Sequence, residues 1–178
     1  MIFQPFFIFC KKKQLIIKKL ASNLRYKIVK EKRKEKKMRK IILASHGELA
    51  KGMKMSAEMI VGKQDNLYAV SMCGTMGPQD VLEEVKRILE GDEKSEAIVI
   101  TDLPGGSVNN ALSVLLQDER YFLVSGMNIM LVLGIVLSDE SVGVNEILEN
   151  AIEDAKKTIL NVRKMLEAQR VEGETFYD

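Results

Sequence analysis

The chain has 178 residues, 46% of them hydrophobic, which is enough to bury the core of one domain of ordinary size. Its net charge of +2 combines two unlike parts: residues 1–37 hold 13 of the 27 Lys and Arg residues and 2 of the 25 Asp and Glu residues, a net +11, so residues 38–178 carry −9. An acidic body gains little from a phosphate backbone, which argues against a nucleic-acid partner.

The basic first part lacks the pattern of an export signal. Its apolar run 1–10 is followed at once by three lysines, whereas a signal peptide places its positive charge before the apolar run, and ten residues are too few to cross a bilayer. A basic membrane-surface helix over 15–30 stays open. The two cysteines, Cys10 and Cys73, form neither a CxxC pair nor a disulfide framework, which favours a cytoplasmic protein.

The run that ends the first part has a simple explanation at the level of the gene. Residues 30–37 are only Lys, Arg and Glu, and all three amino acids have purine-only codons, as the translation of a ribosome-binding site would give. We therefore expect that Met38 is the true start, that residues 1–37 are a mis-annotated or disordered extension, and that residues 38–178 form one domain.

From Met38 onward, predicted strands alternate with predicted helices. In chain order, the patterns predict a strand at 41–44, a helix over 49–60 that ends at Gly62, a strand at 67–72, a helix that begins at Pro78 and ends before Gly91, a strand at 97–100, a helix that opens at 105–107, a strand at 121–124, a buried helix within 127–137, and one long amphipathic helix through 148–166.

This alternation predicts an α/β fold with a doubly wound, mostly parallel sheet of flavodoxin-like topology and a long C-terminal helix. In such a fold the carboxyl ends of the first and third strands meet at the switch point, where ligands bind. His46, the only histidine, ends the first strand, while Asp102 and the run Gly105-Gly106-Ser107 follow the third. The sequence therefore predicts that all of these residues lie at one crevice.

These residue types suit a phosphoryl carrier. An imidazole such as that of His46 can accept a phosphoryl group on one nitrogen, provided that the other nitrogen holds the proton, and a carboxylate such as Asp102 fixes that tautomer. Backbone N–H groups of Gly105, Gly106 and Ser107 at a helix start can bind the phosphoryl oxygens, and the Ser107 hydroxyl can add a further donor. This chemistry requires neither a metal nor a cofactor.

Three segments resemble the IIA components of the mannose-type phosphoenolpyruvate:sugar phosphotransferase systems: 41–47, 101–110 and 125–129. The resemblance extends from about Met38 to about Arg170. It implies a cytoplasmic phosphotransferase that is a homodimer with a doubly wound α/β fold. In this family the histidine at the position of His46 takes phosphate from the phosphocarrier HPr and passes it to a IIB component. IIB then phosphorylates sugar that enters through the membrane components IIC and IID, so contact with the membrane is indirect. Asp102 would orient the imidazole and Ser107 would contact the phosphate.

The sequence departs from the family's usual pattern at three points. Pro104 stands where the family often has an aromatic residue, the pair 108–109 (Val-Asn) stands where it has Pro-Phe, and Met130 stands where it commonly has Pro. The first change can reshape a wall of the site or the partner surface, and none removes the phosphate chemistry. The sequence does not name the sugar.

Other functions stay open at this point. A receiver domain would place its phosphorylated aspartate at Asp102, but it needs an acidic pair after the first strand to hold Mg²⁺, where this chain has Ser45-His46. A hydrolase could combine Ser107, His46 and Asp102, but the sequence around Ser107 is not a Gly-x-Ser-x-Gly elbow. A regulatory or binding module would leave His46 unused.

Overall fold

A computed structural model of the chain describes residues 39–91 and 95–172, with side chains up to residue 167. Four strands form one sheet in the order β2-β1-β3-β4, and every neighbouring pair is parallel. The predicted start at Met38 and the whole extension 1–37 lie outside the described residues, so both stay predictions. The strands are β1 (Lys40–His46), β2 (Leu67–Met72), β3 (Ala97–Thr101) and β4 (Tyr121–Ser125).

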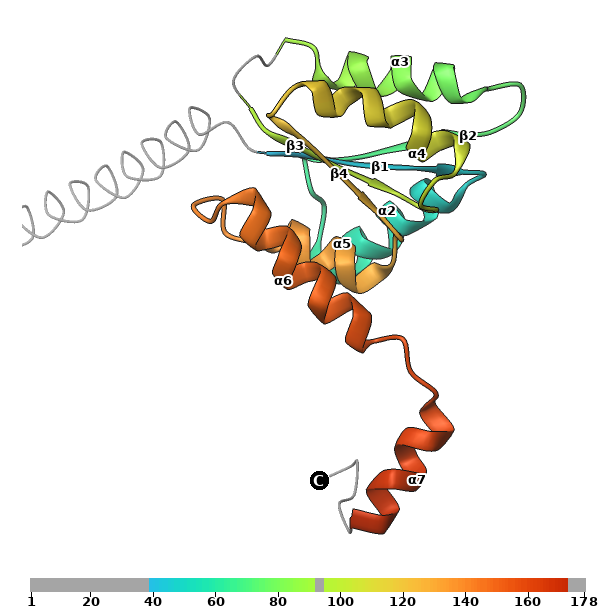
Figure 1. Cartoon of the computed structure of the whole chain (residues 1–178), viewed down its shortest axis with the longest axis vertical. Helices are drawn as coiled ribbons and strands as arrows, with labels where there is room; N and C mark the ends of the chain where they lie inside the picture. Colours follow the sequence, from blue (N-terminus) through green and yellow to red (C-terminus); the bar gives the residue numbers. More distant parts are fainter. Residues whose placement is uncertain (1–38, 92–94, 173–178) are drawn as a thin grey trace, which may run out of the picture. The chain divides into compact units, whose positions relative to one another are not determined.

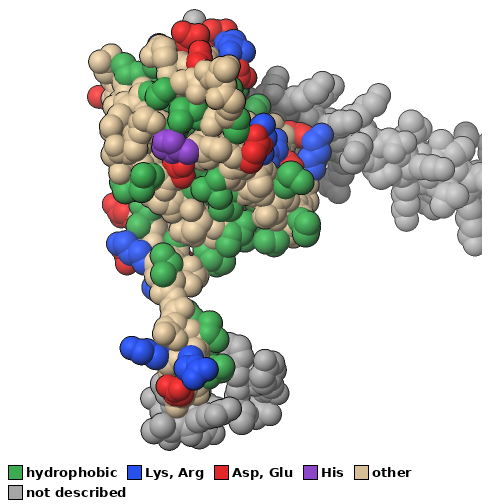
Figure 2. All heavy atoms as spheres, turned by 90° about the vertical axis from the view of Figure 1, so that its right-hand side faces the viewer, with side chains coloured by type: hydrophobic (Ala, Val, Ile, Leu, Met, Phe, Trp, Pro, Cys, Tyr) green, Lys and Arg blue, Asp and Glu red, His purple; other side chains and the backbone are tan. Residues whose placement is uncertain are grey.

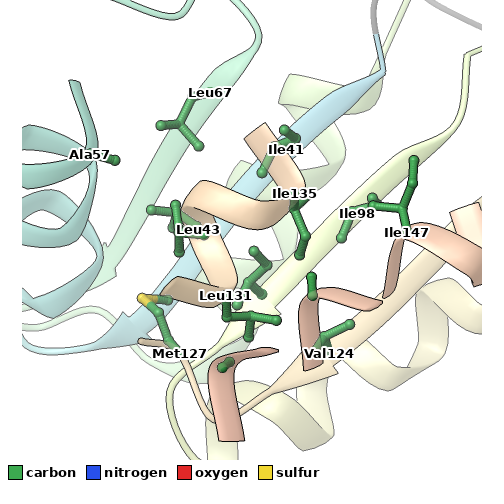
Figure 3. Close-up of a cluster of buried hydrophobic side chains, with 14 of the residues drawn as sticks. Ile41, Leu43, Ala57, Leu67, Ile98, Val124, Met127, Leu131, Ile135 and Ile147 are labelled. Carbon is green, nitrogen blue, oxygen red and sulfur yellow. The ribbon is translucent and has the colours of Figure 1, made fainter. Parts of the chain in front are cut away.

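The two central strands are buried on both faces, as continuous apolar runs predict for a parallel sheet. Successive side chains of a strand point to opposite faces, so Ile41 and Leu43 of β1 belong to one hydrophobic cluster, part of which Figure 3 shows, and Ile42 and Ala44 belong to another. All five residues of β3 are likewise buried. The sheet therefore carries a separate core on each face.

Helices cover both faces (Figure 1). The cluster that contains Leu43 also includes residues of α2 (Leu49–Val61), α5 (Ile129–Val136) and α6 (Val144–Lys157). The cluster that contains Ile42 includes residues of α3 (Pro78–Leu89), α4 (Ser107–Leu112) and the 3₁₀ helix η1 (Ser113–Gln117). This arrangement confirms the predicted α/β, doubly wound, parallel fold.

The prediction of one long C-terminal helix is wrong. Helix α6 ends at Lys157, and a second helix, α7 (Val162–Glu172), follows after four residues outside the two helices. Both the hydroxyl and the N–H of Thr158 donate to the Ala155 carbonyl, and these bonds close the last turn of α6. The Asn161 side chain accepts from the Lys164 N–H at 3.3 Å and so caps the start of α7. Capping side chains thus end a helix whose apolar spacing continues beyond them.

Helix α5 is the predicted buried helix. It begins where the Asn128 side chain accepts the N–H of Leu131 at 3.0 Å, and Leu131, Val132 and Ile135 are buried against the sheet and its other helices. Among the helices of the described part of the chain, none combines the length and the apolar character needed to cross a membrane.

Candidate functional site

The strand order places the candidate residues at one edge of the sheet. β1 and β3 are neighbours, and Ala44 pairs with Thr101, so His46 at the end of β1 lies beside Asp102 just after β3. The loop from Asp102 to Gly106 then leads into α4, whose first residue is Ser107. The structure thus brings the histidine together with the aspartate and the glycine loop, which lie more than fifty residues further along the sequence.

Asp102 holds the histidine by two hydrogen bonds to the same carboxylate oxygen. The ring Nδ1 and the backbone N of His46 each lie 2.9 Å from Oδ2 of Asp102. The other carboxylate oxygen accepts the N–H of Leu103 at 2.9 Å. Both oxygens are therefore occupied, and the carboxylate cannot turn without breaking these contacts.

The hydrogen bonds also set the charge of Asp102. Its side chain is 13% exposed, and this burial alone would raise the carboxyl pKa, but the hydrogen bonds from the His46 ring, the His46 N–H and the Leu103 N–H together outweigh it and lower the pKa below the usual aspartate value. An ionised carboxylate only accepts hydrogen bonds. Nδ1 must then carry the proton, which leaves the lone pair of the neutral ring on Nε2.

Nε2 points toward the start of α4. The Ser107 hydroxyl oxygen lies 3.0 Å from Nε2, at a distance at which the hydroxyl donates to that lone pair. The His46 side chain is 39% exposed, and Figure 2 shows this single histidine, in purple, at the molecular surface with an acidic side chain against it. The ring that carries this lone pair is therefore partly accessible from outside.

Gly106 allows the loop to approach the ring closely. A Cβ atom at this position would lie 3.2 Å from Cε1 of His46 and 3.2 Å from the Leu103 carbonyl oxygen. The backbone at Gly106 is extended, with φ of −67°, so the requirement for glycine here comes from space and not from conformation. Gly105, at φ +70°, has the left-handed backbone that favours glycine.

The N–H groups of the two glycines already have partners within the chain. The N–H of Gly105 donates to the Asn109 side chain at 3.1 Å, and the N–H of Gly106 donates to the Leu103 carbonyl at 3.2 Å. The first i→i−4 bond of α4 runs from the N–H of Asn110 to the carbonyl of Gly106 at 2.9 Å. The N–H groups at the start of this helix, beginning with that of Ser107, therefore have no i→i−4 partner within the helix. Of the three N–H groups expected to bind phosphate, that of Ser107 is the one that the helix geometry leaves available.

Sequence reasoning missed the role of the two asparagines that follow Ser107. Asn109 accepts from Gly105, and Asn110 donates to the Gly105 carbonyl at 2.9 Å. The signal that could have revealed them is their position four and five residues after a glycine at a helix start. The segments 45–48 and 101–110 contain no Lys or Arg, and the described residues contain no cluster of His, Cys, Asp and Glu suited to a metal.

Comparison with known proteins places this geometry in a family. A family model named EIIA-man and described as "PTS system fructose IIA component" matches residues 40–152, which is more than half of the chain and includes every candidate site residue. The chain belongs to the EIIA-man family. This EIIA-man chain is thus a IIA phosphocarrier component of a sugar phosphotransferase system (PTS), and the resemblance drawn from the three motifs is confirmed.

Individual relatives agree with the family match. The chain is 29% identical over 112 residues to the PTS system fructose-specific EIIA component of Bacillus subtilis (strain 168), an alignment that covers 62% of this chain and 77% of the relative. It is 27% identical over 135 residues to the mannose-specific EIIAB component of Escherichia coli (strain K12), covering 74% of this chain and 41% of that protein. The crystal structure of a phosphotransferase system component EIIA from Streptococcus agalactiae superposes with a TM-score of 0.65 at 27% identity, covering 71% of this chain and 99% of that one.

Proposed function

We propose that Nε2 of His46 carries the phosphoryl group, which it takes from phospho-HPr and passes to a IIB component during sugar uptake. The observation that carries this proposal is the 2.9 Å contact between Nδ1 and Asp102, because it leaves the lone pair on Nε2. In the first transfer, the Nε2 lone pair attacks phosphorus as the donor's P–N bond breaks and its electrons return to the donor. The charge that develops on the ring is stabilised by Asp102.

The phosphoryl oxygens need donors beside Nε2. We propose the Ser107 hydroxyl, 3.0 Å from that nitrogen, as the first of them, with the Ser107 N–H at the helix start as the second. Gly105 and Gly106 would contribute by shaping the loop, since their own N–H groups are bonded within the chain. Without Lys or Arg in these segments, the phosphate is held only moderately, as a relay that must release it requires.

The surroundings of His46 suit a protein partner. Each strand is followed by a segment with one large apolar side chain that is 37–57% exposed: Leu49, Met76, Leu103 and Met130. Large exposed apolar patches typically mark protein interaction sites, and these four side chains follow the carboxyl ends of the parallel strands, where His46 also lies. HPr and IIB are the partners we propose, and the name of the Escherichia coli EIIAB relative, in which A and B parts share one chain, supports IIB as the acceptor.

We also propose that this chain is a cytoplasmic homodimer that reaches the membrane only through IIC and IID. The apolar stretch 127–137 does not itself require a dimer, because α5 buries Leu131, Val132 and Ile135 within its own chain. The dimer therefore rests on the resemblance. Sedimentation at micromolar concentration should give twice the monomer mass, and a monomer under these conditions would contradict it.

One rival is favoured by a specific observation. Ser107, His46 and Asp102 form a continuous hydrogen-bonded series, which is also the order of groups in a serine hydrolase. A hydrolase would turn over ester substrates and would lose this activity to a serine-directed inhibitor. A carrier would do neither, and it would be labelled by phospho-HPr.

The test is transfer of phosphate from phosphoenolpyruvate through enzyme I and HPr. We expect one acid-labile phosphate on each chain, and no label on His46→Ala, whose circular dichroism should match that of the wild type. The variant Ser113→Ala serves as a control that keeps the label. An acid-resistant label, or a label that survives in His46→Ala, would contradict the proposal and would favour a phosphoaspartate.

A further inference from the structure

We propose that Asn109 is a positioning residue for phosphotransfer, because it fixes the glycine loop that presents Ser107 to His46. This inference rests on the proposed function of His46. It concerns a residue at which the chain departs from the family's usual Pro-Phe pair, so the resemblance assigns it no role. The structure assigns the role through the two ends of one carboxamide group.

The Asn109 carboxamide bridges the loop and the sheet. Its oxygen accepts the N–H of Gly105 at 3.1 Å, and its nitrogen donates to the hydroxyl oxygen of Thr101 at 3.0 Å. Thr101 is fully buried at the end of β3, and its hydroxyl in turn lies 3.0 Å from the Ser125 hydroxyl at the end of β4. The position of the Gly105 peptide is therefore tied to the ends of two strands.

The Asn109 bridge fixes the two-glycine part of the loop, whose backbone has the most conformational freedom. Two successive glycines give the backbone an unusually large range of conformations, and Gly105 takes its left-handed one at φ +70°. Asn110 holds the carbonyl of the same residue at 2.9 Å, so both sides of Gly105 are fixed by side chains. Only Gly106, packed close to the His46 ring, separates this fixed point from Ser107.

The bridge has a consequence for catalysis. Reacting groups that are misplaced by about 1 Å can lose about a hundredfold in rate, and the 3.0 Å contact between Ser107 and Nε2 depends on where the loop delivers Ser107. Asn109 therefore acts on the rate of transfer through Ser107, without touching the phosphoryl group itself. It also keeps the Gly105 N–H engaged, which limits the phosphate donors to groups from Ser107 onward.

The experiment compares wild type, Asn109→Ala, Asn109→Asp and the control Ser113→Ala in single-turnover transfer from phospho-HPr at increasing HPr concentration, well below each variant's unfolding temperature. For Asn109→Ala we expect the maximal rate to fall about tenfold or more, with the half-saturating HPr concentration unchanged within about twofold. Amide hydrogen exchange at Gly105 should become faster in the same variant. Ser113, an exposed residue of η1 whose hydroxyl donates to the Asn110 carbonyl, should behave as wild type when changed to Ala.

The Asp variant separates positioning from general stability, because a carboxylate can still accept the Gly105 N–H. We expect Gly105 to stay protected in Asn109→Asp and the maximal rate to lie between those of wild type and Asn109→Ala. Wild-type transfer by Asn109→Ala, or unchanged exchange at Gly105 in that variant, would overturn the inference. An unlabelled wild-type chain would refute the proposed function and this inference with it, whereas wild-type transfer by Asn109→Ala would refute this inference alone.

Discussion

The two nitrogens of the His46 ring face two differently built regions. On the Nδ1 side, Asp102 directly follows a central buried strand and accepts three hydrogen bonds at 2.9 Å. On the Nε2 side, Ser107 follows a two-glycine loop that side chains hold in place. The first region is attached directly to the core of the fold, whereas the second is held by side chains of the helix that follows it. This difference matches a carrier whose tautomer must stay fixed while its phosphoryl side admits two successive partners.

The largest effect is expected on the strand-anchored side. In Asp102→Asn, an amide nitrogen can donate to Nδ1 and so place the ring proton on Nε2, which removes the nucleophilic lone pair. We expect the rate of transfer from phospho-HPr to fall by roughly a thousandfold while circular dichroism stays unchanged. Transfer within a few-fold of wild type would remove Asp102 from the mechanism.

A bulkier residue at Gly106 tests the close approach of the loop. In Gly106→Ala the new Cβ would meet Cε1 of His46 and the Leu103 carbonyl, both at 3.2 Å, so the loop must withdraw and carry Ser107 away from Nε2. We expect a loss of transfer rate between about tenfold and a hundredfold. Gly143→Ala is the matched control, because Gly143 also precedes a helix with an extended backbone, and a Cβ added there would have no neighbouring atom within 4 Å.

Removing the Ser107 hydroxyl is a smaller change on the Nε2 side than Gly106→Ala. Ser107→Ala loses one donor to a charged phosphoryl oxygen but keeps its backbone N–H, so we expect transfer to slow by about tenfold, the equivalent of about 1.4 kcal/mol. Single-turnover kinetics would measure this, with Ser113→Ala beside it. A complete loss of transfer would contradict a role for Ser107 that is limited to one hydrogen bond to the phosphoryl group.

The smallest effect concerns pH. Because the pKa of Asp102 is lowered in the folded protein, its ionised form contributes stability that is fully present above the ordinary carboxyl pKa of about 4 and is lost as pH falls through the lowered value. The difference in free energy of unfolding between wild type and Asp102→Asn, measured in urea, should thus shrink as the pH falls below about 4. A difference that grows as the pH falls below about 4 would contradict the lowered pKa.

The sequence was sufficient to predict the strand-anchored region. Continuous apolar runs around Ile42 and Val99 mark central strands, and the topology rule for parallel sheets then brings His46 next to Asp102. The loop side was harder to predict. The one signal is the position of Asn109 and Asn110 four and five residues after Gly105, and this position alone does not decide that they turn back onto Gly105 and occupy its polar groups.

The break after α6 was missed for a related reason. The apolar period continues past Thr158 to Ile159, Val162 and Leu166, so periodicity alone favours one helix. Only the hydrogen bonds of Thr158 and Asn161 decide that the first helix ends and a second begins. In both places, short polar side chains that bond to nearby backbone groups determine the local structure, and their choice of partner is not visible in a pattern of apolar residues.

The function proposed for His46 depends on Asp102, which fixes the proton on Nδ1 and leaves Nε2 to carry phosphate. The most direct test is to phosphorylate a chain labelled with ¹⁵N in its single histidine, using phosphoenolpyruvate, enzyme I and HPr, and to measure the nitrogen–phosphorus coupling by NMR. We expect one phosphorus coupled to Nε2 of His46, with Nδ1 still protonated. Phosphorus coupled to Nδ1, or a phosphorylated chain with no coupling to either ring nitrogen, would contradict this mechanism.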